Sequence, residues 1–265
     1  SLKNYSAHGG RYGAVYSQYG PFFFLFNQAL HFVGFAFPNT DGRIVALVCW
    51  LGAVGLCGAL VWRYTRSVVA TCFVMGGVWL HLWEMISEPG HPGGFIVLVT
   101  AIAGWLGGRW SDQPRKLAVA AGLLGGALLL TKINVGVFLV ASAGAWWVLS
   151  LDDARFSLRL RTAVAVVALG LLPLALMRPL LAQPWVQTFA LTAATGAVTT
   201  VLAAARGARA MTQWADLGWL VTAAGAVMLC TTAAIYFQGT AWSALLEGVV
   251  LGPLRHPLIY TAAYN

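Results

Sequence analysis

The chain has 265 residues, of which 59% are hydrophobic and only 9% are charged, and its formal net charge is +8. Because soluble domains carry roughly 25% charged residues, this composition excludes an ordinary soluble domain and indicates a polytopic membrane protein. The positive charges stand in small groups between apolar segments, which is typical of membrane orientation, so we expect no nucleic-acid partner. The four cysteines lie inside apolar runs without a C-x-x-C pair, and we interpret them as small buried residues.

The first predicted element is a short apolar helix that follows a polar and aromatic segment. Residues 1–20 are broken by four glycines, and Pro21 then suits the first position of a helix. The apolar run from Phe22 to Phe37 is of marginal length for a span, so it predicts either a crossing helix or a helix along the membrane surface. Residues 38–43 combine Pro, Asn, Asp and Gly and predict a turn.

Eight clearer apolar segments follow. We expect them to span the membrane near residues 44–62, 68–86, 93–108, 117–131, 133–150, 160–177, 185–205 and 217–237. The predicted fold is all-α: a polytopic transmembrane helical bundle of about eight spans plus one outer-face juxtamembrane helix. It divides into an outer loop with that helix (1–43), the transmembrane bundle (44–237) and an outer-face segment (238–265).

The distribution of lysine and arginine predicts the orientation. The connections at 63–66, 109–116, 151–161 and 206–209 hold ten of the sixteen Lys and Arg residues and alternate with the other loops, so we expect them to be cytoplasmic. The opposite loops then face the periplasm or exterior of a multi-pass inner (plasma) membrane protein. This assignment requires residues 21–37 to lie along the outer surface.

One outer loop concentrates ionisable residues. His81, Glu84 and Glu88 are spaced i, i+3 and i+7, which places them on one helical stripe, and His91 follows after a Pro-Gly pair. Ionisable groups near a bilayer are costly, so we interpret Glu88, His91 and Glu84 as catalytic candidates, with a carboxylate acting as general base. His81, Glu84 and Glu88 are alternatively candidate ligands of a divalent metal, the only cofactor considered. In the competing interpretation this stretch is a polar helix end in which His91 caps a turn.

Two further outer-face groups suit phosphate and sugar recognition. Lys132 stands alone between two apolar runs, a position that suits an anion such as a lipid phosphate; alternatively it reaches the headgroups as a snorkelling side chain. Arg11 precedes a polar and aromatic group, which fits substrate binding or, equally, an interfacial aromatic belt. The members of that group are Tyr12, Tyr16, Gln18 and Tyr19.

Several functions lack their signatures. The sequence has no G-x-x-x-x-G-K-[ST], no G-x-S-x-G and no C-x-x-C motif, so it shows no ATPase, serine hydrolase or thiol-redox pattern. Charges inside the spans are scarce, which argues against an ion-coupled transporter.

The order of these features resembles the type C membrane glycosyltransferases, in particular protein-mannosyltransferase and aminoarabinose-transferase-like enzymes. The aromatic stretch that begins Tyr19-Gly20-Pro21 resembles their juxtamembrane helix. Arg43 is similar to the arginine that opens their second transmembrane helix, and Glu88 to the acid of their second outer loop. Residues 131–136, Thr-Lys-Ile-Asn-Val-Gly, resemble their Thr-Lys-Gly-Pro-Val-Gly segment.

This resemblance implies transfer of a sugar from a polyprenyl-phosphate donor to an acceptor on the outer face, with Lys132 contacting the phosphate and Arg43 binding substrate. The family's main catalytic aspartate follows its first transmembrane helix, and no acid precedes Asp41 in this chain. We therefore expect either a fragment lacking that helix or an inactive chain. Gln18 and Tyr19 also replace an acid found in the aminoarabinose-type enzymes, so the resemblance defines no metal site. The competing functions are a transporter, a lipid-linked-sugar flippase and an inactive membrane scaffold.

Overall fold

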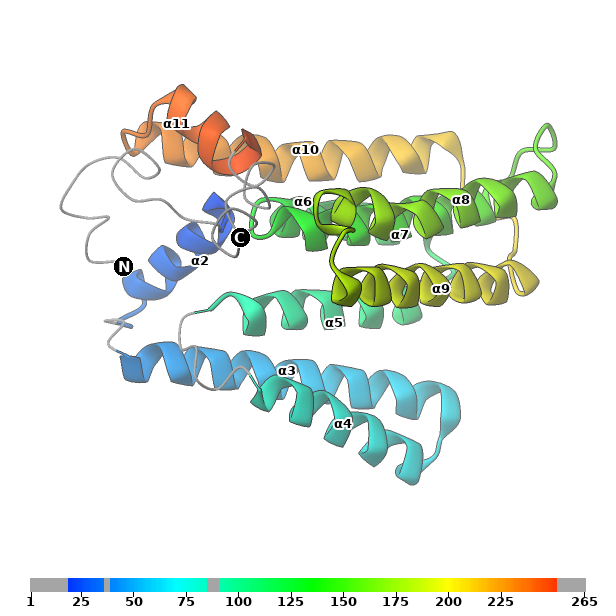
Figure 1. Cartoon of the computed structure of the whole chain (residues 1–265), viewed down its shortest axis with the longest axis horizontal. Helices are drawn as coiled ribbons and strands as arrows, with labels where there is room; N and C mark the ends of the chain where they lie inside the picture. The colour runs from blue at the N-terminus through cyan, green and yellow to red at the C-terminus, as the bar shows by residue number, and fades with distance from the viewer. Residues whose placement is uncertain (1–18, 36–38, 85–90, 252–265) are drawn as a thin grey trace.

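A computed structural model of the chain describes residues 19–35, 39–84 and 91–251, and these residues form an all-α bundle, as predicted (Figure 1). The long helices are α3 (Asn39–Thr65), α4 (Val68–Trp83), α5 (Gly93–Arg109), α6 (Pro114–Leu129), α7 (Ile133–Ser150), α8 (Leu158–Met177), α9 (Pro184–Arg206) and α10 (Trp214–Phe237). The short elements are α2 (Pro21–Phe32), η1 (Arg178–Leu180), α11 (Trp242–Leu246) and η2 (Glu247–Leu251).

Five helices are long and apolar enough to cross a membrane: α3, α7, α8 (continued through η1), α9 and α10. The helices α4 and α5 are apolar but have 16 and 17 residues, and α6 has 16. A chain with this set of helices is a membrane-embedded protein. The number of eight spans stays a prediction.

The helix boundaries differ from the predicted ones mainly around the first long helix. The predicted turn at residues 38–43 is wrong for residues 39–43, because α3 already begins at Asn39. The predicted element at 21–37 is shorter than expected, because α2 ends at Phe32 and Gly34 then takes a positive φ of 101°. Glycine adopts that backbone conformation without the steric cost that a Cβ imposes, so it suits a turn here.

The helix α2 does not have the length of a span. It has 12 residues, so it extends for about 18 Å, against about 30 Å of bilayer hydrocarbon. It lies obliquely at one end of the bundle, close to the ends of the long helices (Figure 1). A position along the membrane surface accounts for its length better than a crossing does.

The long helices pack as two groups. In the first, α3 contacts both α4 and α5; in the second, α6 packs against α7 and α10, while α8 packs against α7 and α9. The helices α6 and α10 pack closely, and a Cβ on Gly122 would lie 2.3 Å from the carbonyl oxygen of Leu220. Small residues allow this approach of two backbones, as in other helix pairs within membranes.

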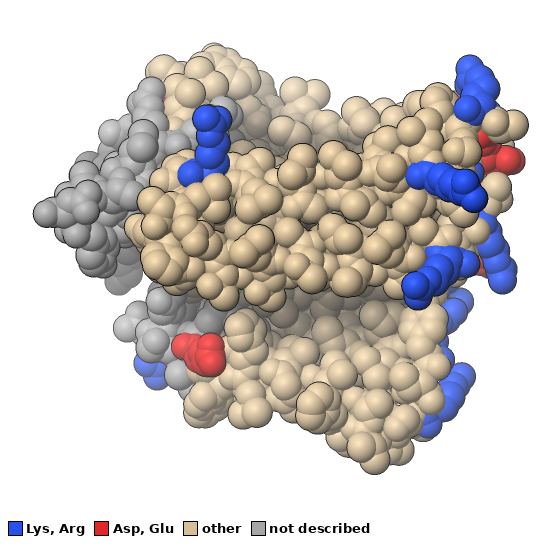
Figure 2. Space-filling model, turned by 45° about the vertical axis from the view of Figure 1, so that its right-hand side comes forward, with Lys and Arg blue, Asp and Glu red and all other residues tan. Residues whose placement is uncertain are grey.

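The two ends of the bundle differ in charge, and Lys and Arg gather at the right-hand end in Figure 2. We call this the basic end; it carries the connections at 66–67, 110–113, 151–157 and 207–213. The opposite end, which we call the α2 end, carries α2 and the N-termini of α5 and α7 (Figure 1). The clustering fits the uneven distribution predicted from the sequence; the side of the membrane that each end faces stays a prediction.

Candidate functional site

At the α2 end, the first turn of α2 meets the last turn of α6. The backbone N–H of Gly20 donates to the carbonyl oxygen of Thr131 at 2.9 Å, and that of Phe22 donates to Leu130 at 3.0 Å. A helix leaves its first N–H groups and its last carbonyl groups without partners inside the helix. Each helix end therefore satisfies the other, which fixes the segment at residues 19–22 beside the connection that contains Lys132.

Glycine at position 20 is required by this contact. A Cβ built there would lie 2.1 Å from the carbonyl oxygen of Leu130, a backbone atom that cannot rotate away. Pro21, the next residue, occupies the first position of α2, where its missing N–H costs nothing. The sequence Gly-Pro is thus explained locally by the joining of two helix ends.

Lys132 lies in the short connection between α6 and α7. Its backbone N–H donates to Leu128 at 2.8 Å, and its carbonyl accepts from Val135 and Gly136 at 3.0 and 3.1 Å. The side chain is partly buried and forms no hydrogen bond or ion pair among the described residues. Its backbone is thus held at both sides while its ammonium group is available to a ligand.

A tight turn places that lysine. A Cβ on Gly136 would lie 2.2 Å from the backbone nitrogen of Leu129, so the start of α7 crosses the end of α6 in close contact. Thr131 is fully buried, and its hydroxyl donates to the carbonyl oxygen of Ala127 at 2.8 Å. Thr131 is thus buried against the end of α6, Lys132 lies in the turn, and Gly136 allows the close contact between α6 and α7.

The third segment at this end begins with His91. The backbone N–H of Gly93, in the first turn of α5, donates to His91 Nδ1 at 2.9 Å. The imidazole meets the ring of Tyr19 edge to face, with ring centroids 5.4 Å apart and an interplanar angle of 89°. Residues 19–22, 91–93 and 130–132 thus converge, and they come from three of the stretches singled out in the sequence.

The bond to Gly93 defines what His91 can do. Because Nδ1 accepts a hydrogen, the neutral ring carries its proton on Nε2. An Nε2–H group donates to an anion and does not remove a proton from a substrate. The geometry therefore suits His91 as a donor and does not favour it as the general base. The predicted capping of a turn by His91 also fits this contact.

An aromatic cluster next to the three segments joins α2, α5 and α6. Phe95 of α5 lies 4.6 Å from Phe26 and 6.1 and 6.2 Å from Phe22 and Phe23, measured between ring centroids. Leu128 of α6 completes the buried cluster. Side chains of α2, α5 and α6 thus hold the site on packed helices, which limits relative movement of Tyr19 and His91.

The other predicted site residues are less closely joined. His81 and Glu84 lie 3.8 Å apart with side chains 78% and 77% exposed, so this pair lies on one stripe, as expected, and is a solvent-facing contact. Arg43 is exposed near the start of α3, and among the described residues it forms no hydrogen bond or ion pair. The predicted residues Arg11, Tyr16, Gln18 and Glu88 lie outside the described residues.

The predicted metal site is not assembled by the described part of the chain. Within residues 19–35, 39–84 and 91–251, no group of three His, Cys, Asp or Glu side chains could hold a metal ion. His81 and Glu84 supply two donors, and the third predicted ligand, Glu88, lies outside these ranges. The described residues by themselves therefore do not fit a divalent metal.

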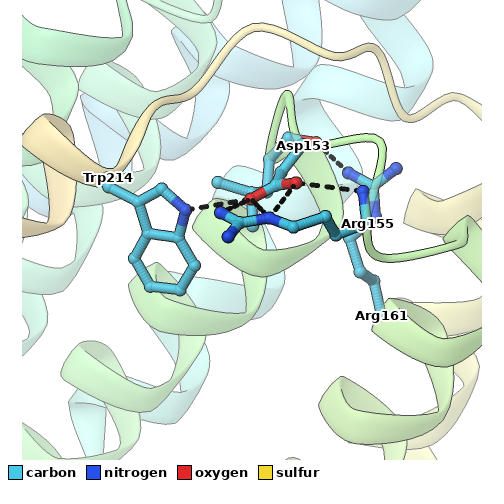
Figure 3. A network of polar contacts seen from close by, with 5 residues as sticks. Asp153, Arg155, Arg161 and Trp214 are labelled. Carbon is cyan, nitrogen blue, oxygen red and sulfur yellow. Dashed lines mark hydrogen bonds and ion pairs between the residues drawn. The ribbon is translucent and has the colours of Figure 1, made fainter.

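A polar network at the basic end was missed by the sequence analysis (Figure 3). Asp153 accepts two hydrogen bonds from Arg155 Nε and one from Nη2, at 3.0, 3.2 and 2.6 Å. The indole Nε1–H of Trp214 donates to the same carboxylate at 3.2 Å. The Arg155 side chain, its backbone N–H and Trp214 together hold the pKa of Asp153 well below its usual range. The contacts join the α7–α8 loop to the start of α10.

This network continues along the backbone. Met211 and Thr212 donate their N–H groups to the carbonyl oxygen of Ser150 at 2.9 and 3.0 Å, and Asp152 donates to Thr212 at 2.8 Å. Arg161 donates to the carbonyl oxygens of Leu149 and Leu151. In the sequence, only the Asp-x-Arg spacing at 153–155 indicates a local ion pair. Trp214, which also donates to Asp153, lies 61 residues further along the chain. The network joins the α7–α8 loop, the start of α8 and the α9–α10 connection at the basic end of the bundle.

The fold and site define a helical membrane protein with a three-segment junction at its α2 end. No family model matches the chain, and neither the curated proteins nor the solved structures contain a match. The function must therefore be inferred from the residues themselves.

Proposed function

We propose that this protein is an integral membrane glycosyltransferase that moves a sugar from a polyprenyl-phosphate-linked donor to an acceptor on the outer face of the inner (plasma) membrane. The observation that carries the proposal is the junction of residues 19–22, 91–93 and 130–132. Two of the stretches on which the resemblance to type C enzymes rests, the one that begins at Tyr19 and residues 131–136, contribute to it. The backbone of Lys132 and the ring pair of His91 and Tyr19 belong to this junction, and an ammonium group, an imidazole and a phenol are the groups that the proposal uses.

The side chains of the junction suit a leaving phosphate. Lys132 carries a positive charge that has no protein partner among the described residues, and His91 presents an Nε2–H donor. Both stabilise the negative charge that develops on the lipid phosphate as the sugar departs. Tyr19 packs against His91 and keeps the imidazole in place, so it is a positioning residue.

Glu88 supplies the general base in this proposal. It accepts a proton from the acceptor hydroxyl, whose oxygen then bonds to the anomeric carbon. The bond between that carbon and the phosphate oxygen breaks, and the lipid phosphate leaves with the electron pair. A carboxylate in this role contributes about 10²–10⁴-fold to the rate.

The direct test measures sugar transfer from a radiolabelled polyprenyl-phosphate donor pool in membranes that contain the full-length protein. We expect Glu88→Gln and Lys132→Ala each to lower transfer by about 10²–10³-fold, because each removes one charge acting on the transition state. The matched controls are Asp152→Asn, an exposed acid at the basic end, and Arg178→Ala, a cation in η1. Unchanged transfer in both test variants, with wild-type expression, would remove these residues from the site.

A substitution at His91 separates catalysis from local structure. Asparagine also accepts a hydrogen bond from the N–H two residues ahead, so His91→Asn keeps the contact with Gly93 while it removes the imidazole Nε2–H. We expect wild-type thermal stability and transfer that is about 10-fold or more lower. Full transfer by this variant would restrict His91 to the capping of α5.

A wild-type protein that transfers no sugar from any donor in the pool would contradict the proposal. Uptake of lipid-linked sugar into the opposite leaflet would then be the next measurement, because it distinguishes a flippase from an inactive scaffold.

A further inference from the structure

A cavity of about 670 Å³ lies near the basic end, away from the junction. It lies between α7 and α9, which barely contact each other, and both helices pack on α8. Its volume is in the range of pockets that bind small ligands, about 300–1,000 Å³. The connections at 110–113 and 207–213 border it at the end of the bundle.

The walls of the cavity are apolar over most of their length. On α9 the lining residues are Gly196, Ala197, Thr200, Val201 and Ala204, none larger than valine. Leu169, a buried residue of the cluster that joins α7, α8 and α9, lines it from α8. Gly196 is exposed, and a Cβ at this position would meet no atom within 4 Å. The cavity is thus open at α9, where small side chains leave room for a hydrocarbon chain.

The border of the cavity carries opposite charges. Asp112, from the α5–α6 connection, and Arg209, from the α9–α10 connection, both line it and are both exposed. Among the described residues, neither side chain forms a hydrogen bond or ion pair, and they do not pair with each other. A carboxylate and a guanidinium are therefore held near the same opening without neutralising each other.

From this arrangement we infer that the cavity binds a zwitterionic phospholipid of the phosphatidylethanolamine class. The guanidinium of Arg209 binds the lipid phosphate, the carboxylate of Asp112 binds the ammonium group, and one acyl chain lies along α9 between α7 and α8. An anionic lipid without an amine would still pair its phosphate with Arg209, but it would leave the carboxylate of Asp112 without a cation beside the negative headgroup. The cavity therefore selects against such lipids, independently of any sugar-transfer activity.

The test measures lipid binding to the purified full-length protein in detergent by native mass spectrometry. The probes are phosphatidylethanolamine and phosphatidylglycerol with identical acyl chains. We expect the wild type to prefer phosphatidylethanolamine, and Asp112→Asn to lower that preference by about fivefold. Arg209→Ala should weaken binding of both lipids by a similar factor. The matched controls are Asp152→Asn and Arg206→Ala, which change neighbouring charges that do not line the cavity.

A steric variant tests the position of the acyl chain. Gly196→Trp fills the cavity from α9 and should remove tight binding of both lipids. Gly225→Trp on α10 makes the same change at another open glycine and should leave binding intact. Equal lipid affinity of these two tryptophan variants, or a wild type without preference between the lipids, would overturn the inference. Size-exclusion profiles identify any variant that fails to fold, and the Asp112 variant, which changes only an exposed side chain, still tests the headgroup assignment.

Discussion

At Gly20 the absence of a side chain decides whether two helix ends can meet. The residue lies against the carbonyl group of Leu130, and its N–H donates to Thr131. No local sequence rule predicts this contact, because Leu130 and Thr131 lie more than a hundred residues along the chain. The Gly-Pro pair was recognised as a helix start, whereas its second role, as a joint with α6, came only from the structure.

Substitution of Gly20 should therefore separate α2 from α6. We expect Gly20→Val to lower the free energy of unfolding by about 2 kcal/mol, since two backbone hydrogen bonds worth about 1 kcal/mol each are lost. The measurement is denaturant unfolding of the detergent-solubilised protein. The control Gly55→Ala, at an open position in α3, should stabilise the protein by about 0.5–1 kcal/mol. Equal stability of Gly20→Val and wild type would contradict the joint.

The contacts of Asp153 predict that the stability of the folded protein depends on pH in the acid range. Its contacts with Arg155 and Trp214 lower its pKa in the folded state from the ordinary value of 3.8. The carboxylate therefore stabilises the fold fully above pH 3.8, and this contribution falls as the pH drops further toward the lower folded-state value. We expect the stability difference between wild type and Asp153→Asn to be greatest at neutral pH and to shrink progressively below pH 3.8. Thermal unfolding of both proteins across a pH series checks this. A stability difference between wild type and Asp153→Asn that grows as the pH falls would contradict the prediction.

At the scale of the elements, the sequence predicted the bundle helices well and α2 only in part. Apolar runs define long membrane helices directly, so α5 and α7 begin at the predicted residues 93 and 133. The start of α3 was missed because Asn, Asp and Gly are typical of turns, yet they form its first turns. The end of α2 was missed because the apolar run continues past Gly34, where the backbone turns.

The helix α2 depends on Phe95 for its attachment. This ring is 9% exposed and contacts three phenylalanines of α2. We expect Phe95→Ala to cost about 3–5 kcal/mol and to expose residues 19–35 to protease. The control Phe73→Ala removes a ring that is 81% exposed on α4 and should change stability by less than about 0.5 kcal/mol. Limited proteolysis, followed by mass spectrometry, distinguishes local detachment of α2 from general unfolding.

At the scale of the whole molecule, the separation of charge between the two ends was predictable from the loop sequences, and the convergence of the junction was not. Tyr19, His91 and Lys132 were each selected for their chemistry and for a shared side of the membrane. Their closeness depends on the packing of α2, α5 and α6, which hydrophobic patterns do not encode residue by residue. The cavity beside α9 was missed because Gly196, Ala197 and Ala204 were read only as parts of an apolar span.

The orientation itself can be tested with single cysteines in a variant that lacks the four native ones. We expect Val33→Cys, after α2, and Ala182→Cys, between η1 and α9, to react with an impermeant maleimide in intact cells. Ala208→Cys, at the basic end, should react only after permeabilisation, because positive loops remain in the cytoplasm. Labelling of Val33→Cys and Ala182→Cys from opposite sides of the membrane would mean that α3 to α8 cross it an odd number of times, which would contradict the predicted orientation.

The joint between α2 and α6 also has a consequence for biosynthesis. The carbonyl groups that receive Gly20 and Phe22 belong to residues synthesised roughly 110 positions later, which takes about 5–20 s at translation rates of about 5–20 residues per second. During that interval α3, α4 and α5 are synthesised while the N–H groups of the first turn of α2 lack their final partners. The first turn of α2 can therefore take its place only when the end of α6 has been made, and the junction is assembled after the first half of the bundle has been synthesised.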